Sequence, residues 1–322
     1  MNPYYFEDEV AKTVDQIGMR AILGETIIQF PVASAKTPED GIKYTLNFIE
    51  QYKDHPRITP AFAPHGPYTN STETLQTIAK LSLKHDVPVM MHLAESDRER
   101  EVIAKRSDGL SPIKYMESIG ALNSNFLAAH VIDANDEDIA ILKKHDVGVA
   151  HNMSANIKSA KGVAPALKMF NDGLRIGLGT DGPMSGNTLS TIDEFNQVAK
   201  VHKLVNKDRA AMPPINVIEM ATIGAARALH MEDKIGSLEV GKLADIIVID
   251  TKAPNMIPVY NPYSALVYSA YATNVKHSVI DGKLLMEDRN ILTVNEKTVR
   301  DEALKFADVV RKTVVESGEI VQ

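Results

Sequence analysis

The stretch Val87-Pro-Val-Met-Met-His-Leu-Ala-Glu95 joins a short apolar run to a histidine at its end and a carboxylate three residues later. A nearly continuous apolar run of this length is typical of a strand buried on both faces, as in a parallel sheet. A histidine at the end of such a strand can bind a metal ion, and a nearby carboxylate can carry a proton. This pairing is weak evidence alone, so the rest of the chain decides its meaning.

The same arrangement occurs five more times along the chain. Each further apolar run ends on a His, Asp or Glu, and the runs cover residues 20–25, 58–65, 126–130, 147–151 and 176–181. Between them, a Ser or Thr or an acidic first turn predicts helices over 38–51, 72–85 and 135–145, because such side chains satisfy the free N–H groups of a helix start. Repeated alternation of strand and helix predicts βαβ units.

The polar residues that end the six runs are the candidates for chemistry. They are Glu25, His65, His92, His130, His151 and Asp181. In a parallel barrel the C-terminal ends of all strands share one face, and that face carries the active site. An open doubly wound sheet is less suited, because no Gly-rich phosphate turn follows the first run. The sequence therefore predicts an α/β fold, a (β/α)8 TIM barrel from which the first two strands are absent.

The segment after residue 235 differs in character from the barrel. Residues 236–250 and 275–286 are predicted short strands punctuated by Gly and Asp, and we expect them to form a remnant of a small β-sandwich beside the barrel. We therefore divide the chain into a barrel domain over 1–235 and a C-terminal β-structure with a terminal helix over 236–322.

The amino-acid composition argues against some classes of partner and of metal ligand. The 322 residues carry a net charge of −7 and contain no cysteine. The acidic balance argues against a nucleic-acid partner, and the lack of thiols leaves His, Asp and Glu as the ligands of any metal. No apolar stretch approaches the length of a membrane span and no leader opens the chain, so we expect a cytoplasmic protein that does not bind membranes.

Taken singly, each candidate has an ordinary explanation. His130 resembles a buried core histidine, Asp181 a turn residue, His65 a loop residue and His151 a partner of the backbone. The other histidines are interpreted as structural or solvated: His55, His85, His145, His202, His230 and His277. However, four histidines and two carboxylates end all six runs, and this joint pattern indicates a functional site.

Several of these stretches resemble the amidohydrolase superfamily, most closely the methylthioadenosine/S-adenosylhomocysteine deaminases. The matching motifs are Ala63-Pro-His-Gly-Pro-Tyr68, Met91-His-Leu-Ala-Glu95, Ala128-Ala-His130, Ala150-His-Asn-Met-Ser-Ala-Asn156 and Leu178-Gly-Thr-Asp-Gly182, followed by Gly241-Lys-Leu-Ala-Asp-Ile-Ile-Val-Ile-Asp250 and Pro258-Val-Tyr-Asn-Pro-Tyr263. The resemblance implies hydrolytic deamination of an amino-purine nucleoside or a similar amino-heterocycle, with release of ammonia. It also suggests self-association.

The resemblance implies a role for each site residue. His92 and Asp181 would bind one divalent metal, zinc or alternatively iron, and Asp181 would take a proton from water. Glu95 would protonate the ring nitrogen, and His130 would orient the attacking water. His65 would contact the substrate, as would Glu95 and Asp181.

The sequence departs from the family pattern in two places. It contains no His-x-His pair, which the family uses as further metal ligands at the end of the first strand. We expect either a shortened chain, with Met1 an internal methionine of a longer protein, or a natural form without the metal. Glu25 stands where members that accept S-adenosylhomocysteine have an arginine, which predicts a substrate without an anionic tail.

Two alternatives to the deaminase stay open. One is another amidohydrolase reaction, such as dechlorination or deamination of a triazine, because fold and metal site are shared among these reactions. The other is a non-catalytic remnant of a barrel, which the absent His-x-His pair favours. Retention of Glu95, His130 and Asp181 argues against the remnant, because a binder needs no proton carrier.

Overall fold

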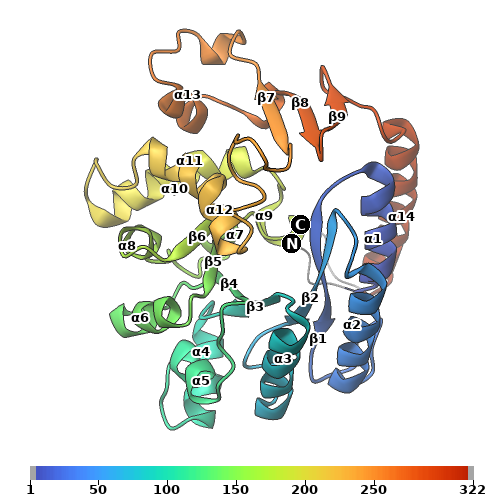
Figure 1. Cartoon of the computed structure of the whole chain (residues 1–322), viewed down its shortest axis with the longest axis vertical. Helices are drawn as coiled ribbons and strands as arrows, with labels where there is room; N and C mark the ends of the chain where they lie inside the picture. The colour runs from blue at the N-terminus through green and yellow to red at the C-terminus, as the bar shows by residue number, and fades with distance from the viewer. Residues whose placement is uncertain (1–4, 318–322) are drawn as a thin grey trace.

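A computed structural model describes residues 5–317, and in this range one parallel sheet forms the centre of the molecule (Figure 1). Its six strands are hydrogen-bonded in the order in which they occur in the chain. They are β1 (Ala21–Ile27), β2 (Ile58–Pro64), β3 (Val89–Leu93), β4 (Phe126–His130), β5 (Gly148–His151) and β6 (Arg175–Leu178). The predicted α/β barrel architecture is confirmed. The interpretation of Met1 concerns a residue outside the described range.

Most of the helices lie around the outside of this sheet, whereas α7 (Met153–Lys158), α9 (Pro183–Gly186) and α12 (Ile223–Ala228) are seen near the centre of the view (Figure 1). The other helices are α1 (Glu7–Ile17), α2 (Pro38–Tyr52), α3 (Thr72–His85), α4 (Asp97–Arg106), α5 (Pro112–Ser118), α6 (Asp136–Lys144), α8 (Ala166–Asn171), α10 (Thr191–Asn206) and α11 (Pro214–Ala221). The predicted helix starts are confirmed: the side chains of Thr37, Ser71 and Asn135 accept hydrogen bonds from first-turn N–H groups.

Two glycines let α12 pack directly on the sheet. A Cβ atom at Gly148 would lie 1.9 Å from the carbonyl oxygen of Ala228, and one at Gly177 would lie 2.5 Å from the Cα of Ala225. No larger residue fits at either position without moving the helix backbone. This close approach places α12 against β5 and β6.

The C-terminal segment forms a separate antiparallel sheet, as predicted. Its strands are β7 (Ile246–Ile249), β8 (Val275–Ile280), β9 (Lys283–Glu287) and β10 (Asn290–Ile291), and the segment also holds η1 (Pro254–Met256), α13 (Pro262–Tyr268), η2 (Ala272–Asn274) and α14 (Glu296–Ser317). Arg20, just before β1, joins this sheet to the barrel: its guanidinium lies 2.5 Å from Asp245 and 3.3 Å from Asp281. These ion pairs connect the residue that precedes β1 to the antiparallel sheet.

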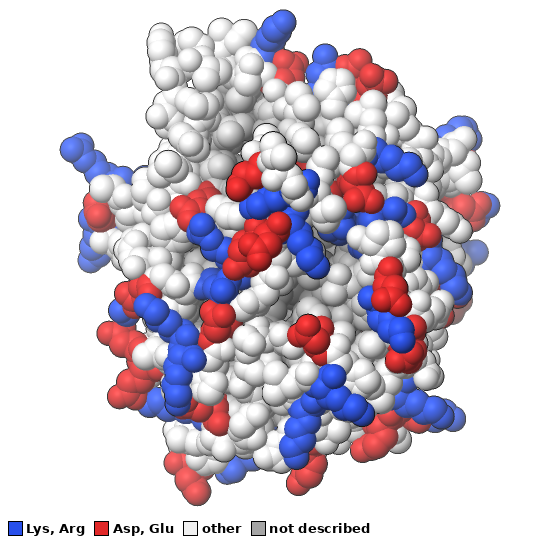
Figure 2. Space-filling view, in the orientation of Figure 1, with Lys and Arg blue, Asp and Glu red and all other residues white. Residues whose placement is uncertain are grey.

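The molecular surface carries charges of both signs. On the face shown in Figure 2, Lys and Arg side chains alternate with Asp and Glu, and neither sign dominates the area around the centre. Across residues 5–317, none of the helices combines the length and the apolar character needed to traverse a lipid bilayer.

Candidate active site

Four of the predicted site residues meet at the C-terminal ends of the strands. The Nε2 atom of His130, at the end of β4, lies 3.1 Å from His92 Nδ1 in β3. The same nitrogen lies 3.6 Å from Glu95 Oε1 and 3.9 Å from Asp181 Oδ2. His92 and Glu95 are near each other in sequence, whereas positions 130 and 181 lie far along the chain, so the parallel sheet is what gathers the four residues.

His65 stands beside this cluster, at the end of β2. Its ring centroid is 5.1 Å from that of His92, and its Nδ1 lies 3.0 Å from the hydroxyl of Thr69. His65, His92 and Asp181 line a cavity of about 780 Å³ whose wall also includes apolar side chains such as Leu127. A cavity of this size, with few polar groups on an apolar wall, suits a small organic ligand.

The backbone is strained where the strands end at the site. Ala94, His130, Val131 and Asp181 have φ values of 53°, 75°, 49° and 60°. Such left-handed conformations are unfavourable for residues other than glycine, and for a β-branched residue like Val131 in particular. The surrounding structure therefore holds the ends of β3, β4 and β6 in turns that aim side chains at one point.

The electrostatics of the cluster favour a neutral imidazole beside carboxylates. Burial, together with the neighbouring His130, lowers the pKa of His92 to about 4, so this ring keeps a free lone pair at neutral pH. Burial raises the pKa of Glu95, but His130 and the ammonium of Lys161 outweigh burial and bring that pKa below the ordinary value. Glu95 is therefore a carboxylate at neutral pH.

The donor atoms fit a divalent metal. One ligand atom from each of His92, Glu95 and His130 lies within 4.8 Å of the others, and Asp181 adds a further carboxylate next to His130. Imidazole nitrogen and carboxylate oxygen are ligands of zinc and of iron. His92 is also unprotonated, which metal binding requires.

Glu25 does not belong to the site, contrary to the prediction from its place at the end of a run. Strand β1 continues to Ile27, and Glu25 is fully buried beside the start of α1, where it accepts hydrogen bonds from the backbone N–H of Glu7 and the hydroxyl of Ser34. A carboxylate at a helix N-terminus satisfies the helix and faces its positive end. The argument that Glu25 repels an anionic substrate tail is therefore wrong.

His151 is also excluded from the cavity. It is completely buried, and its Nε2 lies 3.2 Å from Nε2 of His202 in α10. Burial, and then the partner histidine, lowers the pKa of His151 to about 3, and burial lowers that of His202 to about 4. The pair is a neutral structural contact between β5 and α10, which the sequence did not reveal because position 202 lies 51 residues away.

This pair predicts a loss of stability in mild acid. Because the folded pKa values lie below the ordinary 6.5, the unfolded chain binds more protons as the pH falls, and stability drops below about pH 6.5. From pH 7 to pH 5 each histidine should remove roughly 2 kcal/mol of unfolding free energy. Urea denaturation at both pH values measures this loss.

The His202→Gln variant should show a pH-dependent loss smaller by about one histidine's share, whereas the exposed control His230→Gln should match the unsubstituted chain. Equal losses in the unsubstituted chain and in His202→Gln would show that the buried pair does not contribute.

Three residues at the site escaped prediction. Lys161 pairs with the Glu95 carboxylate, and Glu99 accepts hydrogen bonds from the backbone N–H groups of Ala94 and Glu95 at 2.9 and 2.8 Å. Asn156 bonds the ring of His130. Asn156 lies within the quoted motif of residues 150–156, which was the available signal. Lys161 and Glu99 carried none.

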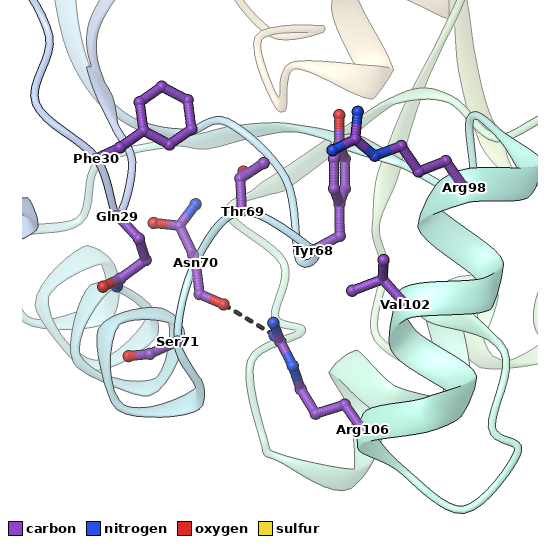
Figure 3. Close-up of a pocket in the computed structure, with 9 residues that line it drawn as sticks. All are labelled: Gln29, Phe30, Tyr68, Thr69, Asn70, Ser71, Arg98, Val102 and Arg106. Carbon is purple, nitrogen blue, oxygen red and sulfur yellow. Dashed lines mark hydrogen bonds between the residues drawn. The ribbon is translucent and has the colours of Figure 1, made fainter.

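A second, smaller cavity of about 400 Å³ is lined by residues of the loop that follows β2 and of α4 (Figure 3). Figure 3 shows Arg98 and Arg106 reaching from α4 toward this loop, with Arg98 beside Tyr68. Arg106 donates to the carbonyl of Asn70 at 2.8 Å. The ring of Tyr68 contacts His65 at 5.9 Å between centroids. The cluster itself faces the larger cavity, so the larger cavity is the candidate active site.

The strand-end cluster and the fold define a family. The sequence pattern of the amidohydrolase family matches residues 2–285, and the chain belongs to this family. It is similar to the 5-methylthioadenosine/S-adenosylhomocysteine deaminase of Syntrophobacter fumaroxidans, with 41% identity over 308 residues that make up 96% of this chain and 70% of the relative. The resemblance inferred from the motifs is confirmed.

Solved structures of similar fold are consistent with this family. An adenosine deaminase from Xanthomonas campestris with bound zinc has a TM-score of 0.93 and 30% identity, covering 97% of this chain and 71% of that one. An atrazine chlorohydrolase from Arthrobacter aurescens complexed with zinc has a TM-score of 0.87 and 19% identity, covering 94% and 70%. The second likeness concerns the fold alone.

Proposed function

We propose that the larger cavity catalyses hydrolytic deamination of an amino-purine nucleoside or a similar small amino-heterocycle, with release of ammonia. The observation that carries this proposal is the meeting of His92, Glu95, His130 and Asp181 at one point beside the cavity. A proton donor, a proton acceptor and an unprotonated imidazole are what the reaction needs. The deaminases among the relatives support the same reaction.

Asp181 and Glu95 carry out the proton transfers of the reaction. Asp181 accepts a proton from the attacking water, whose oxygen bonds to the ring carbon that bears the amine. Glu95, once protonated, donates its proton to the adjacent ring nitrogen. The amine then takes the proton held by Asp181, the carbon–nitrogen bond breaks and ammonia leaves. The proton of the added hydroxyl passes to Glu95, so that a carbonyl remains and both carboxyl groups return to their starting states.

A divalent ion such as zinc, held by His92 and Asp181, would supply hydroxide at neutral pH by lowering the pKa of its water from near 16 to about 7. His130 orients the attacking water, and His65 contacts the substrate ring from the end of β2. Because the Glu95 carboxylate is paired with Lys161, the ammonium of Lys161 must give way before Glu95 can reach a ring nitrogen.

The substrate's tail is a separate question. Glu25 is buried away from the cavity, so its charge gives no reason to exclude S-adenosylhomocysteine. Turnover of methylthioadenosine, adenosine and S-adenosylhomocysteine should therefore be compared directly.

A panel assay tests the reaction. The chain is incubated with these three nucleosides and a chlorinated triazine, and released ammonia and chloride are measured. We expect ammonia from at least one nucleoside and no chloride. Chloride from the triazine without ammonia from any nucleoside would replace the proposal by the dechlorination alternative, and no turnover of any compound would favour the non-catalytic remnant.

We also propose the division into a barrel domain over 1–235 and a C-terminal β-structure over 236–322, and a cytoplasmic location. The change from parallel to antiparallel sheet between β6 and β7 supports the division. The acidic net charge of −7 supports a small-molecule substrate rather than a nucleic acid.

A further inference from the structure

The two ring nitrogens of His130 face different surroundings. Nδ1 lies 2.8 Å from Oδ1 of Asn156, while Nε2 faces His92, Glu95 and Asp181. An amide oxygen can only accept a hydrogen bond, so Nδ1 carries the proton in this contact. A neutral imidazole protonated on Nδ1 has its lone pair on Nε2.

The carboxylates on the other side of the ring favour the opposite arrangement. Glu95 Oε1 and Asp181 Oδ2 lie 3.6 and 3.9 Å from Nε2. Both are acceptors when ionised, so by themselves they would draw the proton to Nε2 and leave the lone pair on Nδ1, where it is of no use to the site. The Asn156 contact is the shorter one and opposes this tendency.

Hydrogen bonds hold the backbone segment that carries Asn156. It is fully buried, and its backbone N–H donates to the carbonyl of Asn152 at 3.1 Å. Its helix, α7, is joined to α10 because the N–H of Ser154 donates to the buried carboxylate of Glu194 at 3.1 Å. These contacts fix the backbone that carries the amide. The Nδ2 atom is buried without a hydrogen-bond partner among the described residues, so the contact of Oδ1 with His130 is the one that orients the amide.

We propose that Asn156 is a positioning residue: it accepts the Nδ1 proton of His130, fixes the tautomer with a free lone pair on Nε2, and aims that lone pair at the cluster. A histidine that orients an attacking water, or that joins a metal's ligands, needs this lone pair. The strained backbone of His130, at φ 75°, places the ring where Asn156 can reach Nδ1.

The tautomer can be observed directly. Nitrogen-15 NMR of histidine-labelled protein distinguishes a protonated Nδ1 from a protonated Nε2, and the loss of one signal pair in a His130→Gln sample assigns the resonances. We expect the unsubstituted chain to carry the proton on Nδ1 of His130, without and with added zinc. A proton on Nε2 would overturn the proposal, and this measurement needs no Asn156 variant to fold.

Two substitutions test the cause. Asn156→Asp keeps an acceptor oxygen and should keep the proton on Nδ1, whereas Asn156→Ala removes the acceptor and should move the proton to Nε2. An unchanged tautomer in Asn156→Ala, with a native unfolding midpoint, would contradict the proposal.

The kinetic part rests on the proposed function. Asn156→Ala should lower kcat about 10- to 100-fold with little change in KM, as expected for a group that orients a reacting side chain. Asn156→Asp should recover most of the loss. Equal losses in both variants would indicate a merely structural role. If the unsubstituted chain releases no ammonia, the proposed function fails, while the NMR result still decides the role of Asn156.

Discussion

Replacing Glu95 with glutamine should lower kcat for ammonia release by about 10²- to 10⁴-fold, the usual worth of a general acid–base residue. Glutamine keeps the size of the side chain and its hydrogen-bonding reach but cannot carry the proton to the ring nitrogen. The turn that bears Glu95 should stay in place, because Glu99 holds the N–H groups of Ala94 and Glu95 through its own carboxylate. Steady-state ammonia release measures the effect.

The matched control is Glu101→Gln, which removes an exposed carboxylate from α4, the helix that follows Glu95. It should leave kcat unchanged. A Glu95→Gln variant with the control's kcat would show that Glu95 moves no proton in the slow step, and the acid–base part of the account would be abandoned.

Replacing His92 with alanine should remove bound metal. His92 supplies a buried, unprotonated nitrogen at the centre of the cluster. Without this nitrogen the cluster keeps His130, Asp181 and Glu95, but Glu95 is paired with Lys161. Fewer than the three protein ligands that a catalytic zinc generally needs would then be free to bind it. We expect about one equivalent of zinc in the unsubstituted chain and less than about a tenth of that in His92→Ala, by elemental analysis after preparation without chelators.

The surface variant His230→Ala should retain the metal of the unsubstituted chain. His230 is exposed and its ring contacts the carbonyl of Asp146, just before the start of β5, whereas the cluster lies at the other ends of the strands. If His92→Ala keeps as much zinc as His230→Ala, the metal lies elsewhere and the ligand assignment is wrong.

Local chemistry explains how much of the fold could be predicted. The starts of α2 and α3 could be predicted from Thr37 and Ser71, because a helix cap depends on residues only a few positions apart in sequence. The buried parallel strands could also be predicted, because each is a short run of consecutive apolar residues. The end of β1 could not be placed as well, because the strand extends beyond Glu25 to Ile27 and only the packing of α1 decides which side chain faces inward.

Some residues of the site could be predicted from the sequence and others could not. His65, His92, His130 and Asp181 could be grouped from the sequence because each ends a strand of one parallel sheet, and that topology brings strand ends together. His151 obeys the same rule and yet is buried against His202. Its ring faces a helix rather than the cavity, and no spacing in the sequence records that contact.

Partners that come from loops are harder still to foresee. Lys161 reaches Glu95 across 66 positions of the chain, and nothing near it in sequence distinguishes it from a solvated lysine. Its effect is nevertheless chemical, since it helps to keep the pKa of Glu95 below the ordinary value.

The central claim is that the strand-end cluster performs metal-dependent deamination. The most direct measurement is ammonia release from methylthioadenosine by the purified chain as prepared, after removal of metal with a chelator, and after addition of zinc. The account predicts turnover that disappears with the metal and returns with zinc. Turnover that is unaffected by complete removal of metal, or no turnover with zinc bound in full, would contradict it.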